Sequence, residues 1–73
     1  MARTNSIIQE VDTFIGNKVY NARLARGMTR QQLAQTIGVT HQQLQKYEKG
    51  LNRISVGRLL LIAEALKENI NYF

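Results

Sequence analysis

The sequence predicts an all-α domain, and three features lead to this prediction. Apolar residues recur at helical spacing along the chain, proline is absent, and no segment shows the pattern of a β-strand. A serine, threonine or asparagine stands before each of the later helical segments, where its side-chain oxygen can accept a hydrogen bond from a free helical N–H. Because 73 residues allow one small core, we expect four or five short helices packed as a single compact domain.

The first helix is predicted over residues 13–26. Apolar or aromatic side chains recur there at helical spacing, and Gly27 ends the run. For residues 1–12 two alternatives remain: a flexible arm, or an extra helical turn that uses apolar residues such as Ile7. We therefore expect the folded domain to cover residues 13–73, preceded by this short segment.

Residues 29–50 contain two short helix signatures joined by one glycine turn. Thr29 and Thr40 each stand three residues before a glutamine, which is the spacing of a capping box: the hydroxyl accepts from a helical amide and the glutamine reaches back to the cap. Gly38 and Gly50 follow the two segments, where a left-handed residue can close a helix at low steric cost. The two helices are expected at residues 30–37 and 41–49.

The last part of the chain follows the same rules. Ser55 is expected to cap a fourth helix that continues to about Lys67 and has an apolar face along one side. Asn69 has the position of a cap for a fifth helix, which has barely begun at Phe73.

Positive charge is concentrated where the paired helices lie. Residues 16–58 carry eight basic residues and one acidic residue, whereas the rest of the chain carries two basic and four acidic residues. Binding of a polyanion such as DNA requires a concentration of this kind. The alternative is a solvated basic surface without a partner.

Composition argues against several other classes of protein. The chain has no cysteine, which excludes disulfides and thiolate metal sites, and it has no apolar run long enough to span a bilayer. It has one histidine and one aspartate, and it lacks an acid pair at catalytic spacing, a metal-ligand cluster and a phosphate-binding glycine loop. We therefore expect neither an enzyme nor a bound metal or cofactor, and no contact with a membrane.

The paired-helix region also resembles a known family. The matching residues are Leu33, Ala34, Ile37, Gly38, Val39, Leu44, Tyr47, Glu48 and Gly50, followed by Ala65, Leu66, Ile70 and Phe73. This pattern is similar to the helix-turn-helix domain of phage repressors, the xenobiotic-response-element (XRE) family that includes the lambda and 434 repressors and the Cro proteins. The resemblance covers roughly residues 13–73.

The resemblance implies a lambda-repressor-like fold with a helix-turn-helix unit at about residues 30–49. Its second helix, at about residues 40–49, would be the recognition helix, which enters the major groove. The resemblance also implies a buried ion pair between Arg23 and Glu48. Two exposed charges are the alternative for these residues.

The start of a recognition helix faces base edges, so the resemblance implies specific DNA contacts. Glutamine can pair with adenine through two hydrogen bonds, and lysine can donate to guanine. The residues expected to contact bases are Thr40, His41, Gln42 and Lys46. Capping and phosphate contact are the alternative for Thr40, and an exposed side chain without a partner is the alternative for His41. The residues expected to contact the DNA backbone are Arg30, Gln31, Gln43, Asn52, Arg53 and Arg58. Lys46 has the alternative of reaching a phosphate, and relatives often have glutamine where Arg30 stands.

The predicted function is sequence-specific binding of double-stranded DNA by a prokaryotic or phage transcriptional regulator, more specifically a repressor. Relatives bind pseudo-palindromic operators as two-fold dimers, so a homodimer in the cytoplasm of a bacterium or phage-infected host, associated with the nucleoid, is expected. The rival function is an antitoxin or adaptor-type protein-interaction module with the same fold and secondary DNA binding. The apolar residues that offer a self-contact, or else complete the core, are Leu60, Leu61, Ile70, Tyr72 and Phe73.

Overall fold

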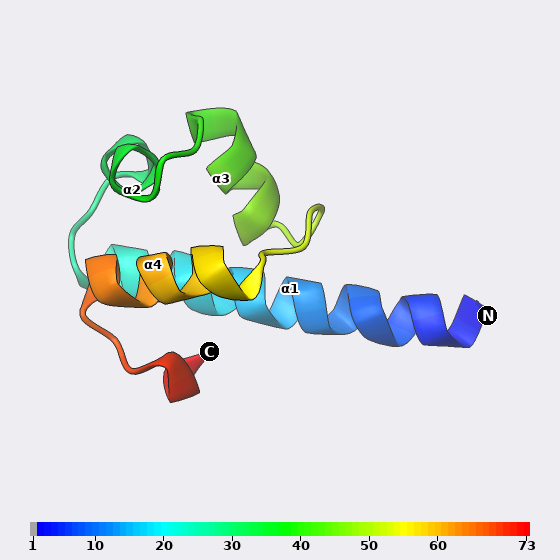
Figure 1. The fold of residues 1–73 in the computed structure, drawn as a ribbon. Helices are drawn as coiled ribbons and strands as arrows, with labels where there is room; N and C mark the ends of the chain where they lie inside the picture. Colours follow the sequence, from blue (N-terminus) through cyan, green and yellow to red (C-terminus); the bar gives the residue numbers. More distant parts are fainter. Residues whose placement is uncertain (1) are drawn as a thin grey trace.

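A computed structural model describes the backbone of residues 2–73 and the side chains of residues 6–73. Its elements are α1 (Ala2–Ala25), α2 (Arg30–Ile37), α3 (His41–Glu48), α4 (Val56–Leu66) and the 3-10 helix η1 (Ile70–Tyr72). The prediction of an all-α domain is confirmed, since residues 2–73 contain no strand (Figure 1).

The first helix begins much earlier than the sequence predicted. Residues 2–12 are helical and continuous with the segment expected at 13–26, so the described part of this segment is neither a flexible arm nor a single added turn. Met1 lies outside the described residues. Neither glycine nor proline interrupts the chain before Gly16, so the helical backbone can continue without a break. Figure 1 shows the N-terminal half of α1 extending beyond the other helices.

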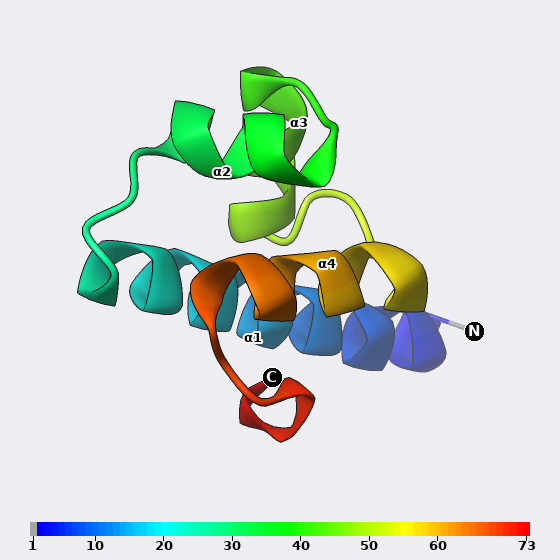
Figure 2. The same ribbon diagram turned by 60° about the vertical axis from the view of Figure 1, so that its left-hand side comes forward.

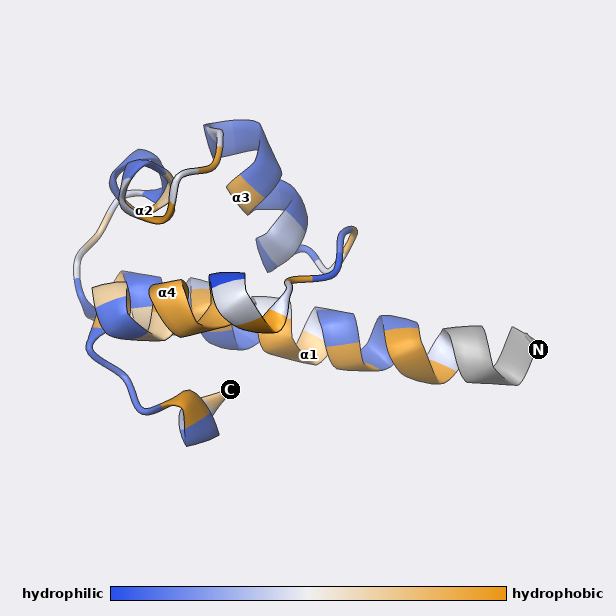
Figure 3. Cartoon of the chain, in the orientation of Figure 1, coloured by the Kyte–Doolittle hydropathy of each residue, from blue (hydrophilic) through white to orange (hydrophobic). Residues whose placement is uncertain are grey.

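The other helices pack around the second half of α1. α4 lies alongside α1, with α2 and α3 on one side of this pair and η1 on the other (Figures 1 and 2). α3 is largely hydrophilic along its surface, whereas α4 is largely hydrophobic (Figure 3). The buried core cluster consists of Val19, Ala22, Leu33, Ala34, Ile37, Leu44, Ile62 and Leu66.

The caps set the ends of the paired helices. At the start of α2 the Gln32 amide donates to the Thr29 hydroxyl at 3.1 Å, and the Thr29 amide donates to the Gln32 side chain at 2.9 Å, which is the expected capping box. At the start of α3 the Gln43 amide donates to the Thr40 hydroxyl at 3.0 Å. Among the described residues no bond runs from the Thr40 amide to the Gln43 side chain, so only half of the capping box expected there is formed. Gly38, at φ 75°, closes α2 in the left-handed conformation as predicted.

The backbones of α1 and α3 touch at Gly16. A Cβ atom on Gly16 would collide with the backbone carbonyl oxygen of Tyr47 and would lie 2.8 Å from that of Glu48. Close by, a Cβ atom on Gly50 would lie 2.6 Å from the Cα of Thr13. The C-terminal end of α3 is therefore fixed directly against α1, while Figure 1 shows its N-terminal end pointing away from that helix.

Substitution of Gly16 by alanine tests this contact. The added methyl group meets backbone atoms at the end of α3, which cannot move without shifting that helix, so we expect Gly16→Ala to lower the free energy of unfolding by about 1–3 kcal/mol. The measurement is urea or thermal denaturation followed by circular dichroism.

Gly57→Ala is the matched control, because Gly57 is also helical and a Cβ there would meet nothing within 4 Å. Its stability should be unchanged or higher by up to about 1 kcal/mol, since alanine favours a helix over glycine. Equal stability of the two variants would show that α1 and α3 are not in close contact.

Candidate nucleic-acid interface

The outward face of α3 is polar and open to solvent. The side chains expected to contact bases, Thr40, His41, Gln42 and Lys46, are all exposed. Leu44 on the opposite face is fully buried, and Tyr47 is partly buried against the core. Because Leu44 anchors one side of this short helix, the polar side chains gather on the other side, where they can meet a ligand.

The residues expected to contact the DNA backbone lie in three places. Arg30 and Gln31 open α2, Gln43 lies in the first turn of α3, and the others lie in the α3–α4 loop or early in α4. The exposed members of this set are Gln31, Asn52 and Arg53, and the partly buried members are Arg30, Gln43 and Arg58.

All three arginines of this set make structural contacts that the sequence did not reveal, and those of Arg58 and Arg53 join α4 to α2 and the α3–α4 loop to α1. The Arg58 Nη1 donates at 2.5 Å to the carbonyl oxygen of Ile37, at the C-terminal end of α2. The Arg53 Nε lies 3.5 Å from the Asp12 Oδ1, but the Arg53 side chain is 65% exposed. An ion pair so exposed contributes little to stability, so Arg53 is available to another partner. Arg58 is in part committed to joining α4 to α2.

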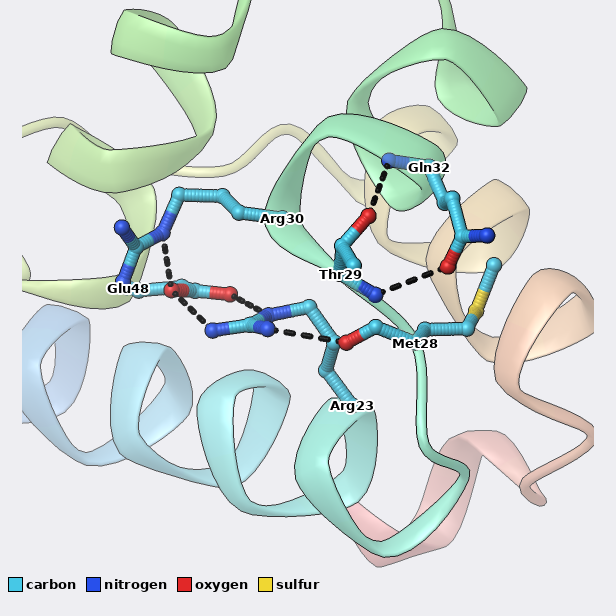
Figure 4. A network of polar contacts seen from close by, with 6 residues as sticks. All are labelled: Arg23, Met28, Thr29, Arg30, Gln32 and Glu48. Atoms are coloured by element: carbon cyan, nitrogen blue, oxygen red, sulfur yellow. Dashed lines mark hydrogen bonds and ion pairs between the residues drawn. The ribbon is translucent and has the colours of Figure 1, made fainter.

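The ion pair implied for Arg23 and Glu48 is formed and is buried. The Arg23 Nε donates to the Glu48 Oε2 at 2.7 Å, and the Arg23 Nη2 donates to Oε1 at 3.3 Å (Figure 4). The Arg23 Nη1 also donates to the carbonyl oxygen of Met28 at 2.9 Å. The two side chains are only 6% and 3% exposed, so this pair links α1 to the end of α3 inside the protein.

Arg30 shares the same carboxylate, which the sequence did not indicate. Its Nε donates to the Glu48 Oε1 at 2.9 Å, and its side chain is 27% exposed (Figure 4). Two guanidinium groups therefore surround one carboxylate, and the cluster of Arg23, Arg30 and Glu48 carries a net positive charge. The separation of 18 residues between Arg30 and Glu48 offers no local spacing rule that would have found the contact.

A second cationic contact holds the C-terminal segment. The Lys18 ammonium lies 4.6 Å from the ring centre of Tyr72 and 5.4 Å from that of Phe14. Lys18 thus joins η1 to α1 through cation–π contacts and is less available to DNA than its charge suggests. Within residues 6–73, no group of three or more metal-ligating side chains could hold a metal ion. No helix in the described part of the chain is long and apolar enough to cross a membrane.

Comparison with known proteins identifies helix-turn-helix transcriptional regulators as relatives of this chain. A helix-turn-helix family model matches residues 19–73. An uncharacterized HTH-type transcriptional regulator of Rickettsia conorii is 70% identical over 73 residues, which are 100% of this chain and 58% of that relative. An uncharacterized transcriptional regulator in the ATPase CF(0) region of Rhodospirillum rubrum is 48% identical over 66 residues, which are 90% of this chain and 61% of that relative. The chain thus spans less than two thirds of the length of either relative.

Among solved structures, the restriction-modification controller protein C.AhdI from Aeromonas hydrophila has the same fold. The TM-score is 0.82 over 88% of this chain and 93% of that chain, with 22% sequence identity. Helix order and packing are therefore shared even where the sequences have diverged.

Removal of the shared carboxylate tests the buried cluster. We expect Glu48→Ala to lower the free energy of unfolding by about 3–5 kcal/mol, because it leaves the Arg23 guanidinium buried without its partner. The measurement is chemical or thermal denaturation of the two proteins.

Glu64→Ala provides the control, since Glu64 is an exposed carboxylate on α4. It should change stability by no more than about 0.5 kcal/mol. A melting temperature of Glu48→Ala equal to that of the unmodified chain would refute a structural role for the carboxylate.

Proposed function

This chain belongs to the XRE-type helix-turn-helix family, and from this we propose that it is a DNA-binding domain of a transcriptional regulator, which reads double-stranded DNA through α3. One observation carries the proposal: the N-terminal end of α3 presents exposed polar side chains, while its C-terminal end is fixed to α1. A helix held in this way can enter the major groove without losing its orientation.

The proposed base contacts follow from the chemistry of this face. Gln42 can form paired hydrogen bonds with adenine, and Lys46 can donate to the acceptors of guanine. His41 stands at the first position of α3, close to the DNA in this arrangement. The Thr40 hydroxyl oxygen accepts the cap bond from the Gln43 amide, and its O–H can still donate to a base edge or a phosphate.

The proposed backbone contacts flank α3 on both sides. Gln31 and Arg30 at the start of α2 lie where free helical N–H groups favour a phosphate, and Asn52 and Arg53 extend from the α3–α4 loop. Gln43 in the first turn of α3 and Arg58 early in α4 are the other two proposed contacts, and contacts of this kind hold the protein on any sequence. Such contacts also orient α3 for base readout.

We further propose that the protein acts as a homodimer on a pseudo-palindromic operator and represses transcription by excluding polymerase in the bacterial cytoplasm. Half-sites would lie about 34 Å apart, one helical turn of DNA. Of the apolar residues considered for a self-contact, Tyr72 and Phe73 pack against the core, whereas Leu60, Leu61 and Ile70 are exposed. The exposed three therefore support the dimer, and the other two complete the core.

An antitoxin or adaptor-type protein-interaction function is the second candidate. One observation favours it: Ile7, Val11 and Phe14, on the projecting half of α1, are each at least half exposed. In that case α3 would bind DNA only secondarily. A gel-shift titration of the chain against its own upstream DNA, with random DNA as the control, separates the two functions, because an adaptor would show no preference for either duplex.

Gln42→Ala tests base readout. We expect it to reduce discrimination between a selected site and random DNA by about 1–3 kcal/mol, because the paired hydrogen bonds to one base are lost. The measurement is fluorescence anisotropy with a duplex selected from a random library. Binding to random DNA should change little.

Arg53→Ala tests phosphate contact. We expect it to weaken binding to every sequence alike and to reduce the slope of log affinity against log salt by about one. The same anisotropy titrations, repeated over a range of salt concentrations, provide the measurement. If both variants lose equal affinity for selected and random DNA, the division between base and backbone contacts is wrong.

A further inference from the structure

The cluster of Arg23, Arg30 and Glu48 points to a role for Glu48 beyond the core. We propose that Glu48 is a positioning residue for DNA binding: it holds the Arg30 guanidinium so that the terminal amino groups of Arg30 meet a backbone phosphate. The inference rests on the proposed function. It concerns how one phosphate contact is built.

The contact with Glu48 leaves part of the Arg30 guanidinium available. Arg30 donates to the Glu48 Oε1 through Nε, the inner nitrogen of its guanidinium, at 2.9 Å. Its two terminal nitrogens have no hydrogen-bond partner within residues 6–73, and the side chain is partly exposed, so a ligand can reach them. An arginine can therefore keep Nε on the carboxylate while its terminal nitrogens form two bonds with a phosphate.

The carboxylate that holds Arg30 is itself fixed in place. Glu48 cannot follow Arg30, because Arg23 holds both of its carboxylate oxygens, at 2.7 and 3.3 Å. Arg23 is in turn bonded to the Met28 carbonyl and buried to all but 5% of its surface. Figure 4 shows the Arg30 side chain reaching from α2 to this fixed carboxylate. The long side chain is thus ordered on folding, and little further order is needed when DNA binds.

The cluster of Arg23, Arg30 and Glu48 keeps one positive charge. One carboxylate placed between two guanidinium groups neutralises only one of them, and Arg23 is the one that is inaccessible. The remaining positive charge therefore lies with Arg30 at the first residue of α2, where the helix dipole also favours an anion.

Arg30→Lys provides the direct test. Lysine keeps the positive charge beside Glu48, so the fold is retained, but a single ammonium group lacks the planar fork needed to hold carboxylate and phosphate in fixed directions. The probe is a random-sequence duplex, because a phosphate contact is independent of sequence. We expect affinity to fall about tenfold, as far as in Arg30→Ala, and the salt slope to fall by about 0.9 in both variants.

Arg26→Lys is the matched control, since Arg26 is also an arginine paired with a glutamate, Glu68 at 3.7 Å, but lies outside the proposed DNA contacts. It should bind the random duplex within about twofold of the unmodified chain, because the positive charge is kept and no phosphate contact is lost. If Arg30→Lys also binds like the unmodified chain with the same salt slope, charge alone suffices and the positioning role is overturned.

Glu48→Gln, measured with and without Arg30→Ala, gives a second readout. We expect Glu48→Gln to weaken binding when Arg30 is present and to have no further effect in Arg30→Ala, at temperatures where circular dichroism shows folded protein. Equal weakening in both backgrounds, or tighter binding of Glu48→Gln, would overturn the inference. If Glu48→Gln does not fold, the lysine variants decide.

DNA binding by the unmodified chain distinguishes a failure of this inference from a failure of the proposed function. Absence of binding to every duplex would overturn the proposed function itself. Normal binding with an unaffected Arg30→Lys would overturn only the positioning by Glu48.

Discussion

The Glu48 carboxylate lies where three helices meet: its own helix α3, α1 through Arg23, and α2 through Arg30. A charge so deeply buried is tolerated only when it is paired and hydrogen-bonded, and here both oxygens accept from guanidinium groups. The energetic gain over an apolar substitute is small, because desolvation offsets most of the attraction. The bonds between Glu48 and the two arginines instead fix the orientation of α3, because planar guanidinium groups hold its C-terminal end in a set position relative to α1 and α2.

This constraint matters because α3 has little else to hold it. Leu44 is its fully buried apolar residue, and burial of one leucine contributes only about 1.5–3 kcal/mol. The polar residues that fill the rest of the helix cannot be buried without cost, and their exposure is what makes them usable. The missing side chain at Gly16 lets the α1 and α3 backbones approach, which brings Glu48 within reach of Arg23. Close backbone contact and the buried charge therefore replace a larger apolar face.

The features that residue patterns predicted are those with local causes, whereas the long-range pair of Arg23 and Glu48 was predicted through the family resemblance. The start of α2 after Thr29 and its end at Gly38 follow from residues within one turn, and the exposure of Gln42 follows from its position relative to Leu44. The early start of α1 was missed because helical continuity there needs no signal beyond the absence of a breaker. The other long-range contacts were missed for another reason: bonds such as that from Arg58 to the Ile37 carbonyl depend on helix packing, which no spacing rule encodes.

The basic residues of this chain differ in how available they are to an anion. Formal charge counts Arg23, Arg26 and Arg30 equally, yet their surroundings differ. Arg23 is buried against Glu48, and Arg26 bonds the Lys67 carbonyl at 2.9 Å and lies 3.7 Å from the Glu68 carboxylate. Of these three, Arg30 is the one whose guanidinium is fixed through Nε and leaves both terminal nitrogens open to an anion. The strength of attraction to a polyanion is therefore set by which cations the fold leaves unneutralised and ordered, and the folded protein places such a cation at the start of α2, beside the helix that reads the groove.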